Sequence, residues 1–231
     1  MITIKTSGSL VIDASTAVYG FFKARSKESG KQKLRVMKDG YTFDYDIGTK
    51  DIIVPLQIGN GTYAVVLYQN VSGNRYSSRG AVKIPVTLDN EFAPYLHSNQ
   101  YVDYCGNSDI ENYTWSLADE NFSRNVENIK EDIRDRYTYD YIKAVMVKTF
   151  ELPDIERCFY KKTGICQDLA ALAVAMCRIV KIPAKLVIGK CGRSNHAWCE
   201  IYYDGKWNIY DPTADVQHNK KKKEYVKERW Y

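Results

Sequence analysis

Short runs of alternating apolar and polar residues fill the first 90 residues of the chain. Six of these runs are rich in valine, isoleucine, tyrosine and threonine, and KDG, GNG and SGN turn sequences punctuate them. The runs are SLVIDAS (9–15), KLRVMKDG (33–40), YTFDYDI (41–47), DIIVPLQI (51–58), TYAVVLYQNV (62–71) and AVKIPVTLD (81–89). Short strands at such close intervals are typical of an antiparallel sandwich. We therefore expect an immunoglobulin-like β-sandwich module over residues 1–90.

The pattern changes after residue 90. Residues 91–110 are polar and turn-rich, which indicates a linker. A helical pattern follows, because apolar residues recur at steps of three and four. Its apolar positions are Phe122, Val126, Ile129 and Ile133. Residues 166–180, CQDLAALAVAMCRIV, are apolar around most of a helical circumference and therefore predict a buried helix.

Three strand-like runs come after these helices. They are AKLVIGK (184–190), HAWCEIYY (196–203) and WNIYDPT (207–213). Helices followed by strands indicate an α+β arrangement. We expect this second domain, which carries the candidate chemistry, to span residues 111–231.

Cys166 stands where the buried helix is expected to begin, two residues after Gly164. In the first turn of a helix, free backbone N–H groups and the helix dipole favour an anion, and hence a thiolate. A thiol at the end of a rigid buried helix is well placed for chemistry. On position alone, however, the alternative is that Cys166 packs as a small core residue, as free cysteines usually do.

A predicted hairpin changes that balance. Asp204-Gly205 separates two alternating apolar runs, which is the strongest short-range hairpin signal. With these two residues at the turn, counting outward makes His196 a diagonal neighbour of Asp211 on one face. A carboxylate in that place orients an imidazole and stabilises its protonated form, and the imidazole can take the thiol proton. The spacing therefore predicts a catalytic triad of Cys166, His196 and Asp211.

Composition excludes several other classes of protein. The chain has 231 residues and a net charge of +5, to which the KKKK run at 220–223 contributes most. Because the basic residues form no stripe interleaved with aromatic residues, we expect no nucleic-acid partner. The run is either a solvated segment or a site of attraction to an anionic cell surface. No apolar run is long enough for a transmembrane helix, and the start of the chain does not resemble a secretory signal.

The six cysteines form no C-x-x-C pair. A zinc site of Cys191, His196 and Cys199 lacks the usual spacing of paired ligands, so we expect no metal and no cofactor. A redox or metal protein that uses these cysteines remains an alternative. Disulfide pairs, such as one between Cys105 and Cys158, cannot be assigned from the sequence.

Two long segments together resemble the transglutaminase-like core of the papain-like cysteine enzymes. They are GICQDLAALAVAMCRIVKIPAKLVIG (164–189) and NHAWCEIYYDGKWNIYDPT (195–213). RDRYTYDY (134–141) is similar to an element that ends an earlier helix in bacterial members. The resemblance implies a central helix packed on an antiparallel sheet, with Cys166 as nucleophile, His196 as general base and acid, and Asp211 as the orienting carboxylate. The β-rich module resembles a sandwich that precedes this core in some bacterial secreted or cell-surface members.

The resemblance implies a cysteine acyl-transfer enzyme, a protease, amidase or acyltransferase, that acts on protein or peptide amides through a thioester. We expect hydrolysis somewhat ahead of cross-linking. Cross-linking members place a tryptophan indole in the oxyanion hole, whereas here no tryptophan lies between RDRYTYDY and Cys166. The Cys166 backbone N–H is one candidate donor, and Tyr139 or Trp115 could be the second. The alternative is a non-catalytic adhesion or scaffold protein that keeps the fold. Secretion or a cell-surface location, and a cell-surface ligand of the first module, follow from the resemblance alone.

Overall fold

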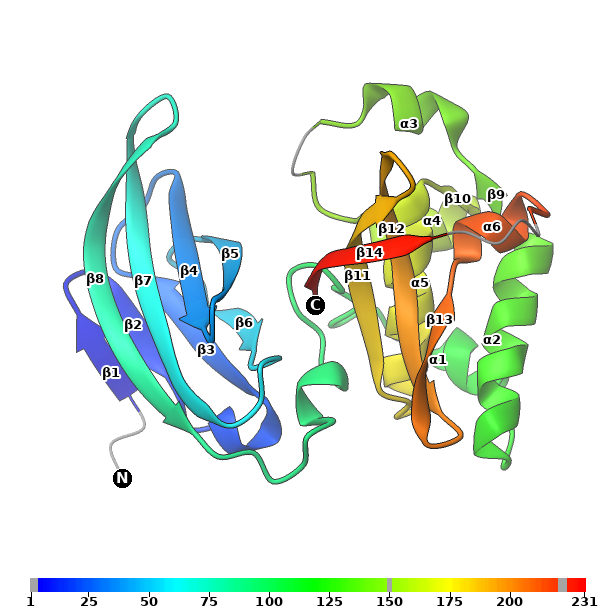
Figure 1. Ribbon diagram of the computed structural model, residues 1–231, viewed down its shortest axis with the longest axis horizontal. Coiled ribbons are helices and arrows are strands. Elements are labelled where there is room, and N and C mark those ends of the chain that lie inside the picture. The colour runs from blue at the N-terminus through cyan, green and yellow to red at the C-terminus, as the bar shows by residue number, and fades with distance from the viewer. Residues whose placement is uncertain (1–3, 149–150, 220–223) are drawn as a thin grey trace. The chain divides into compact units, whose positions relative to one another are not determined.

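The computed structural model describes residues 4–148, 151–219 and 224–231. The chain divides into two compact units, Met1–Gln100 and Tyr101–Tyr231 (Figure 1). The division falls inside the segment 91–110, which the sequence marks as a linker. This segment also contains the 3-10 helix η2 (Ala93–Tyr95).

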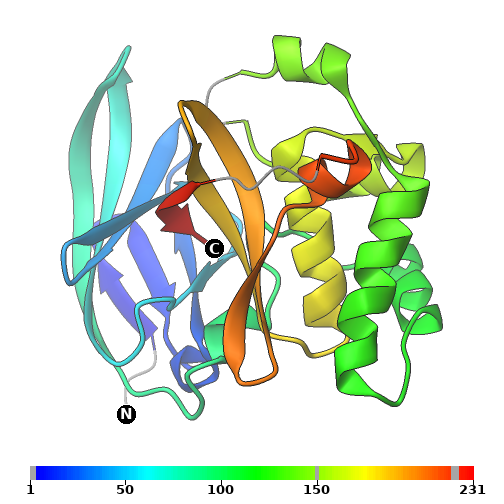
Figure 2. The same cartoon turned by 45° about the vertical axis from the view of Figure 1, so that its right-hand side comes forward.

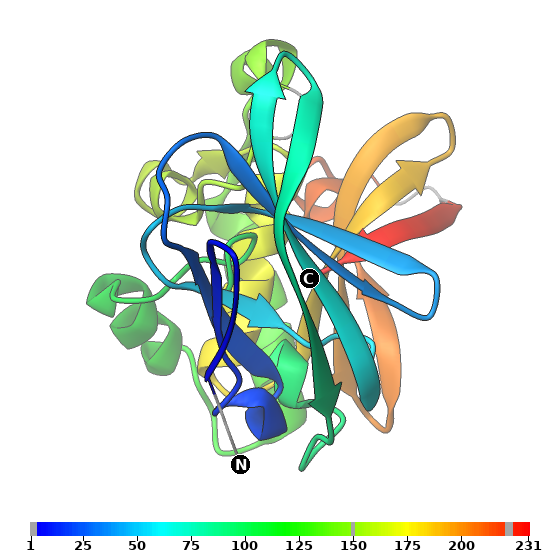
Figure 3. The same cartoon turned by 90° about the vertical axis from the view of Figure 1, so that its left-hand side faces the viewer.

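Two four-stranded antiparallel sheets make up the first unit (Figure 3). One has the order β1-β2-β3-β6 and the other β5-β4-β7-β8. The strands are β1 (Ile4–Ser7), β2 (Leu10–Asp13), β3 (Phe21–Ser26), β4 (Gln32–Lys38), β5 (Tyr41–Ile47), β6 (Ile52–Pro55), β7 (Gly61–Ser72) and β8 (Arg75–Val86), with the 3-10 helix η1 (Ala17–Tyr19) before β3. In β4, Leu34 and Val36 are buried whereas Arg35 between them is half-exposed. This alternation gives each sheet one apolar face, and the two faces supply the core.

The second unit combines six helices with a four-stranded antiparallel sheet, among the residues described. The helices are α1 (Ser108–Ser116), α2 (Phe122–Arg136), α3 (Tyr141–Met146), α4 (Ile155–Lys161), α5 (Cys166–Ile179) and α6 (Pro212–Val216). The sheet has the order β13-β12-β11-β14. Its strands are β11 (Ala184–Cys191), β12 (Ser194–Tyr203), β13 (Lys206–Tyr210) and β14 (Tyr225–Trp230), and a short parallel pair joins β9 (Thr138–Tyr139) to β10 (Thr163–Gly164). The predicted α+β class is confirmed.

Helix α5 lies at the centre of this unit. One side packs against β11 and β12, and α1, α2 and α4 pack against other parts of it (Figure 2). Every residue from Asp168 to Ile179 is buried. In α2, Val126, Ile129 and Ile133 are buried as their spacing predicts, whereas the side chain of Phe122 lies outside the described set. The small side chains of α5 let its neighbours approach closely, so the core is built around it.

A buried arginine fixes the C-terminal end of α5. Arg178 is fully buried and donates to the carbonyl of Ala184 from Nε at 3.0 Å and from Nη2 at 2.8 Å. Its Nη2 also donates to the Tyr231 backbone oxygen at 2.8 Å. A buried charge is tolerated only when its donors are satisfied in this way. Arg178 thus joins the end of α5 to β11 and to the residue after β14.

Gly189 allows β14 to lie close to β11. The pairing of these strands shifts register between Ile188 and Gly189. A Cβ atom at Gly189 would lie 2.1 Å from the Val226 carbonyl oxygen and 3.0 Å from the Trp198 ring. Only glycine therefore fits at this position without moving the edge strand.

Gly189→Ala is therefore expected to destabilise the fold. Overpacking at such a contact costs about 1–3 kcal/mol, and each kcal/mol lowers Tm by about 2–4 °C in a chain of this size. Differential scanning calorimetry measures the change. Gly48→Ala is the matched control, because a Cβ there meets nothing within 4 Å. Equal Tm values for the two variants would contradict this account of the close approach of β14 to Gly189.

Candidate active site

Cys166 is the first residue of α5, as the sequence predicts, and its side chain is partly buried. The preceding residue, Ile165, has an extended backbone and serves as the N-cap of the helix. The first backbone N–H groups of a helix have no partner within it, and they point toward the space in front of the helix. Cys166 therefore combines a thiol with a backbone donor at one end of a rigid element.

A buried carboxylate that the sequence reading missed holds this end of α5. Asp168 is fully buried, and its Oδ2 accepts hydrogen bonds from Ile165 N at 3.0 Å and from Lys143 Nζ at 2.8 Å. Its Oδ1 accepts from Asp154 N at 3.0 Å. The signal for this role was an aspartate in the first turn of an otherwise apolar helix. Asp168 fixes the backbone directly beneath Cys166.

The hairpin has the register expected from the sequence. Asp204 and Gly205 have φ values of 52° and 74°, which are the positive angles that a two-residue hairpin turn requires. Tyr203 pairs with Lys206, and the pairing continues to Cys199 opposite Tyr210.

The same register places His196 beside Asp211. The distance from His196 Nε2 to Asp211 Oδ2 is 3.0 Å, and the two side chains are 12% and 5% exposed. The Oδ1 atom of Asp211 accepts from Ala214 N at 3.2 Å, because Asp211 is also the N-cap of α6. Both carboxylate oxygens of Asp211 are therefore engaged in hydrogen bonds, which fix the carboxylate so that it can orient the imidazole.

The Cys166 thiol lies close enough to His196 to raise the pKa of the imidazole. Burial opposes the charged imidazole, but the hydrogen bond to Asp211 and the nearby Cys166 thiol outweigh it and raise the pKa of His196 from 6.5 to about 9. A raised pKa means that these interactions stabilise the fold fully below about pH 6.5 and lose this effect as the pH rises through 9. At neutral pH the imidazole of His196 is therefore protonated.

Tyr225 is a further member of the site that the sequence reading missed. Its hydroxyl donates to Asp211 Oδ2 at 2.8 Å, the same oxygen that His196 contacts. Its ring lies 6.3 Å from the His196 ring and 5.0 Å from that of Trp198, centroid to centroid. Burial and the bond to Asp211 raise the pKa of Tyr225, so its hydroxyl stays protonated and remains a donor. Tyr225 shares the orienting carboxylate with the histidine.

The two candidates for the second oxyanion donor differ in position. Tyr139, in β9, packs on the edge of the core, and burial followed by the charge of Cys166 raises its pKa. Tyr139 pairs with Gly164, two residues before Cys166, and its protonated hydroxyl is suited to donate a hydrogen bond. Trp115 lies at the end of α1 with 53% of its surface exposed, which does not favour a role in a buried site. Both roles stay predictions.

The cysteines do not converge on a metal. All six are free thiols. Cys199 donates to the Ala170 carbonyl of α5 at 3.3 Å, whereas His196 contacts Asp211. Within the described residues, no group of three metal-ligating side chains occurs. Cys191, His196 and Cys199 therefore do not form the cluster that a zinc site would require.

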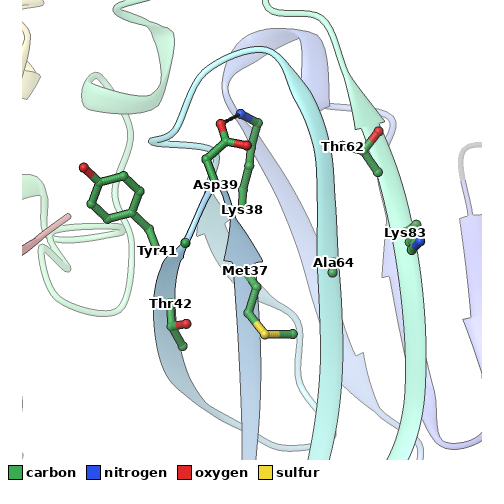
Figure 4. A pocket seen from close by; sticks show the side chains of 9 residues that line it. Met37, Lys38, Asp39, Tyr41, Thr42, Thr62, Ala64 and Lys83 are labelled. Atoms are coloured by element: carbon green, nitrogen blue, oxygen red, sulfur yellow. Dashed lines mark hydrogen bonds and ion pairs between the residues drawn. The ribbon is translucent and has the colours of Figure 1, made fainter.

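The first unit carries a shallow pocket with a volume of about 450 Å³ near the turn between β4 and β5 (Figure 4). Its lining is Met37, Lys38, Asp39, Gly40, Tyr41, Thr42, Thr62, Ala64 and Lys83. Lys38 and Asp39 form an ion pair there. This lining holds no pairing of a nucleophile with a base. The KKKK run at 220–223 lies outside the described residues, and no helix among those described could span a membrane.

Comparison with known proteins found a family match in the second unit. Residues 110–212 match the model of the transglutaminase-like superfamily. An uncharacterized protein of Mycobacterium leprae (strain TN) is 35% identical over 96 residues, which cover 36% of this chain and 32% of that protein. The chain thus spans about a third of the length of this curated relative.

Two solved structures are also similar. One is a candidate cysteine protease from Cytophaga hutchinsonii, with 19% identity and a TM-score of 0.47 over 87% of this chain and 71% of the other. The second is the periplasmic domain of TgpA from Pseudomonas aeruginosa, with 13% identity and a TM-score of 0.44 over 92% and 75% of the two chains. At these scores the assignment rests on the family model, whose span contains Cys166, His196 and Asp211. Residues 110–212 are therefore similar to the transglutaminase-like superfamily, the family whose model matches this segment.

Proposed function

We propose that this protein is a cysteine acyl-transfer enzyme that acts on peptide or side-chain amides through a thioester on Cys166. One observation carries the proposal: His196 is hydrogen-bonded to Asp211 and lies close enough to Cys166 for the thiol to raise its pKa. A nucleophile, a base and a group that orients the base form the arrangement that covalent catalysis requires. The similarity of the segment to this family supports the same reaction class.

In the first step, the Cys166 thiolate attacks the amide carbonyl carbon and forms the C–S bond. The Cys166 backbone N–H stabilises the oxyanion, with Tyr139 as the proposed second donor. The C–N bond then breaks as the His196 imidazolium gives its proton to the leaving amine. The products of this step are a thioester on Cys166 and a neutral imidazole.

In the second step, His196 takes a proton from the attacking group, which adds to the thioester carbonyl. The C–S bond breaks, and the thiolate and imidazolium are restored. Water as the acceptor gives hydrolysis, which we favour, whereas a primary amine gives a new amide. The triad is common to both outcomes, so the acceptor is set by what reaches the thioester.

Cys166→Ala is expected to abolish both amide cleavage and incorporation of a labelled primary amine, while the fold is kept. Iodoacetamide should label Cys166 in the wild-type protein, as peptide mass spectrometry would show. Cys105→Ala is the matched control, because Cys105 is an exposed thiol outside the site. Full activity in the Cys166→Ala protein, or an inert Cys166 in the native state, would instead favour the non-catalytic scaffold.

In the pH profile of kcat/KM, the activity is expected to fall at alkaline pH with a midpoint near pH 9, where His196 loses its proton. Asp211→Asn removes the charge that favours the imidazolium, and it should move this midpoint down by about 1–3 pH units. The rate should fall by about 10⁴-fold, because the imidazole loses its orientation. Midpoints that coincide in the two proteins would show that Asp211 does not act on His196.

Tyr225→Phe is expected to shift the same midpoint in the opposite direction. Without the Tyr225 hydroxyl, Asp211 Oδ2 has one donor fewer and holds the imidazolium more strongly. The midpoint should therefore rise, and kcat should fall several-fold because the carboxylate is less well fixed. Tyr202→Phe, which changes a tyrosine of β12 outside this cluster, serves as the control. A Tyr225→Phe profile that superimposes on the wild-type profile would contradict the assigned contact.

A further inference from the structure

Helix α3 exposes apolar side chains that a surface helix normally buries. Tyr141, Ile142, Val145 and Met146 are 67%, 76%, 88% and 74% exposed. We call these four residues the α3 apolar face. They form two i, i+4 pairs on neighbouring rows, so they share one side of the helix. None of the residues of α3 is buried.

Polar contacts, and not the apolar face, hold α3 in place. Lys143 donates to the buried Asp168 carboxylate at 2.8 Å, with its own side chain 13% exposed. Asp140 caps the helix by accepting from Lys143 N at 2.8 Å, and it forms an ion pair with Arg157 at 2.9 Å. The helix is thus reversed relative to an ordinary amphipathic one, with its charge inward and its apolar residues outward. The α3 apolar face therefore makes no contribution to the core of this unit, and its exposure needs another explanation.

The α3 apolar face is linked to both sides of the candidate active site. Lys143 reaches Asp168, which fixes the start of α5. Tyr139 pairs with Gly164, two residues before Cys166, and its ring lies 5.0 Å from the Tyr141 ring. On the other side, the Tyr141 hydroxyl accepts from Gln217 Nε2 at 3.3 Å, directly after the helix that Asp211 caps. In Figures 1 and 2, α3 lies at the end of the second unit where β12 and α6 begin. Helix α3 thus contacts both the start of α5 and the end of α6, the two elements that carry Cys166 and follow Asp211.

We propose that the α3 apolar face binds the acyl-donor polypeptide, through an aliphatic or aromatic side chain next to the amide that Cys166 attacks. This inference rests on the proposed function. Exposed clustered apolar residues mark binding surfaces, and methionine and tyrosine are suited to such contacts. The net charge of +5 opposes a second copy of the chain as the occupant. The enzyme would thus prefer amides flanked by apolar residues.

The test compares two peptidyl vinyl sulfones that differ in one side chain, leucine or serine, next to the reactive group. Their second-order rates of labelling Cys166 are measured in the full chain. The wild-type protein should react with the leucine probe at least 10-fold faster, a ratio that one hydrophobic side chain in a site supplies. Val145→Lys should reduce this ratio at least five-fold. Val145 is 88% exposed, so the substitution should leave Tm unchanged.

Two controls separate this inference from the proposed function. Val71→Lys changes a residue that is 63% exposed in the first unit, and it should leave the ratio unchanged. Iodoacetamide carries no side chain, so it should label Cys166 equally in all three proteins. Equal rates for the two probes with wild-type protein, beside normal iodoacetamide labelling, would overturn the α3 inference alone. Failure of iodoacetamide labelling would overturn the proposed function, and the inference with it.

Other occupants have distinct signatures. A second copy would appear as a dimer in sedimentation that Val145→Lys dissociates, with no change in the ratio of probe rates. A membrane would appear as binding to phosphatidylserine vesicles that Val145→Lys weakens, again with that ratio unchanged. Either result overturns the assignment of the face to the acyl donor.

Discussion

The burial of α5 is the constraint on which the second unit depends. From Asp168 onward the helix has no exposed side, because the sheet covers one part of its surface and other helices cover the rest. Its C-terminal end is tied to the sheet through Arg178. Its N-terminal end is held by Asp168, which is buried and fully engaged. Cys166 can be the first residue of α5 and still be accessible only because these contacts fix the rest of the helix.

Features with local causes were predictable from the sequence. The turn at Asp204 and Gly205 fixes the pairing of two adjacent strands, so counting residues was enough to place His196 beside Asp211. The apolar run of α5 likewise predicted its own burial. The proximity of Cys166 to His196 could not be predicted in this way, because it depends on how a helix packs on a sheet and no local sequence signal reports it. Only the family resemblance suggested it, and the structure supplies the contact.

Elements with weak patterns were missed. Strand β14, YVKERW, carries charges at exposed positions because it lies at the edge of the sheet, so its sequence has little apolar alternation. Tyr225 was overlooked for this reason. Helix α3 could not be separated from the helical pattern before it, although Tyr137 adopts an extended backbone that ends α2. Its apolar residues resemble a core-facing stripe in the sequence, whereas the structure turns them outward.

The central claim is that Cys166, His196 and Asp211 act as one electrostatically coupled unit, and a titration of His196 by NMR tests it most directly. The chain has three histidines, so a His196→Gln sample identifies the resonance. We predict that His196 titrates near pH 9 in the wild-type protein and at a clearly lower pH in Cys166→Ala, because the thiol contributes to its raised pKa. A His196 that titrates near 6.5 in both proteins would contradict the account.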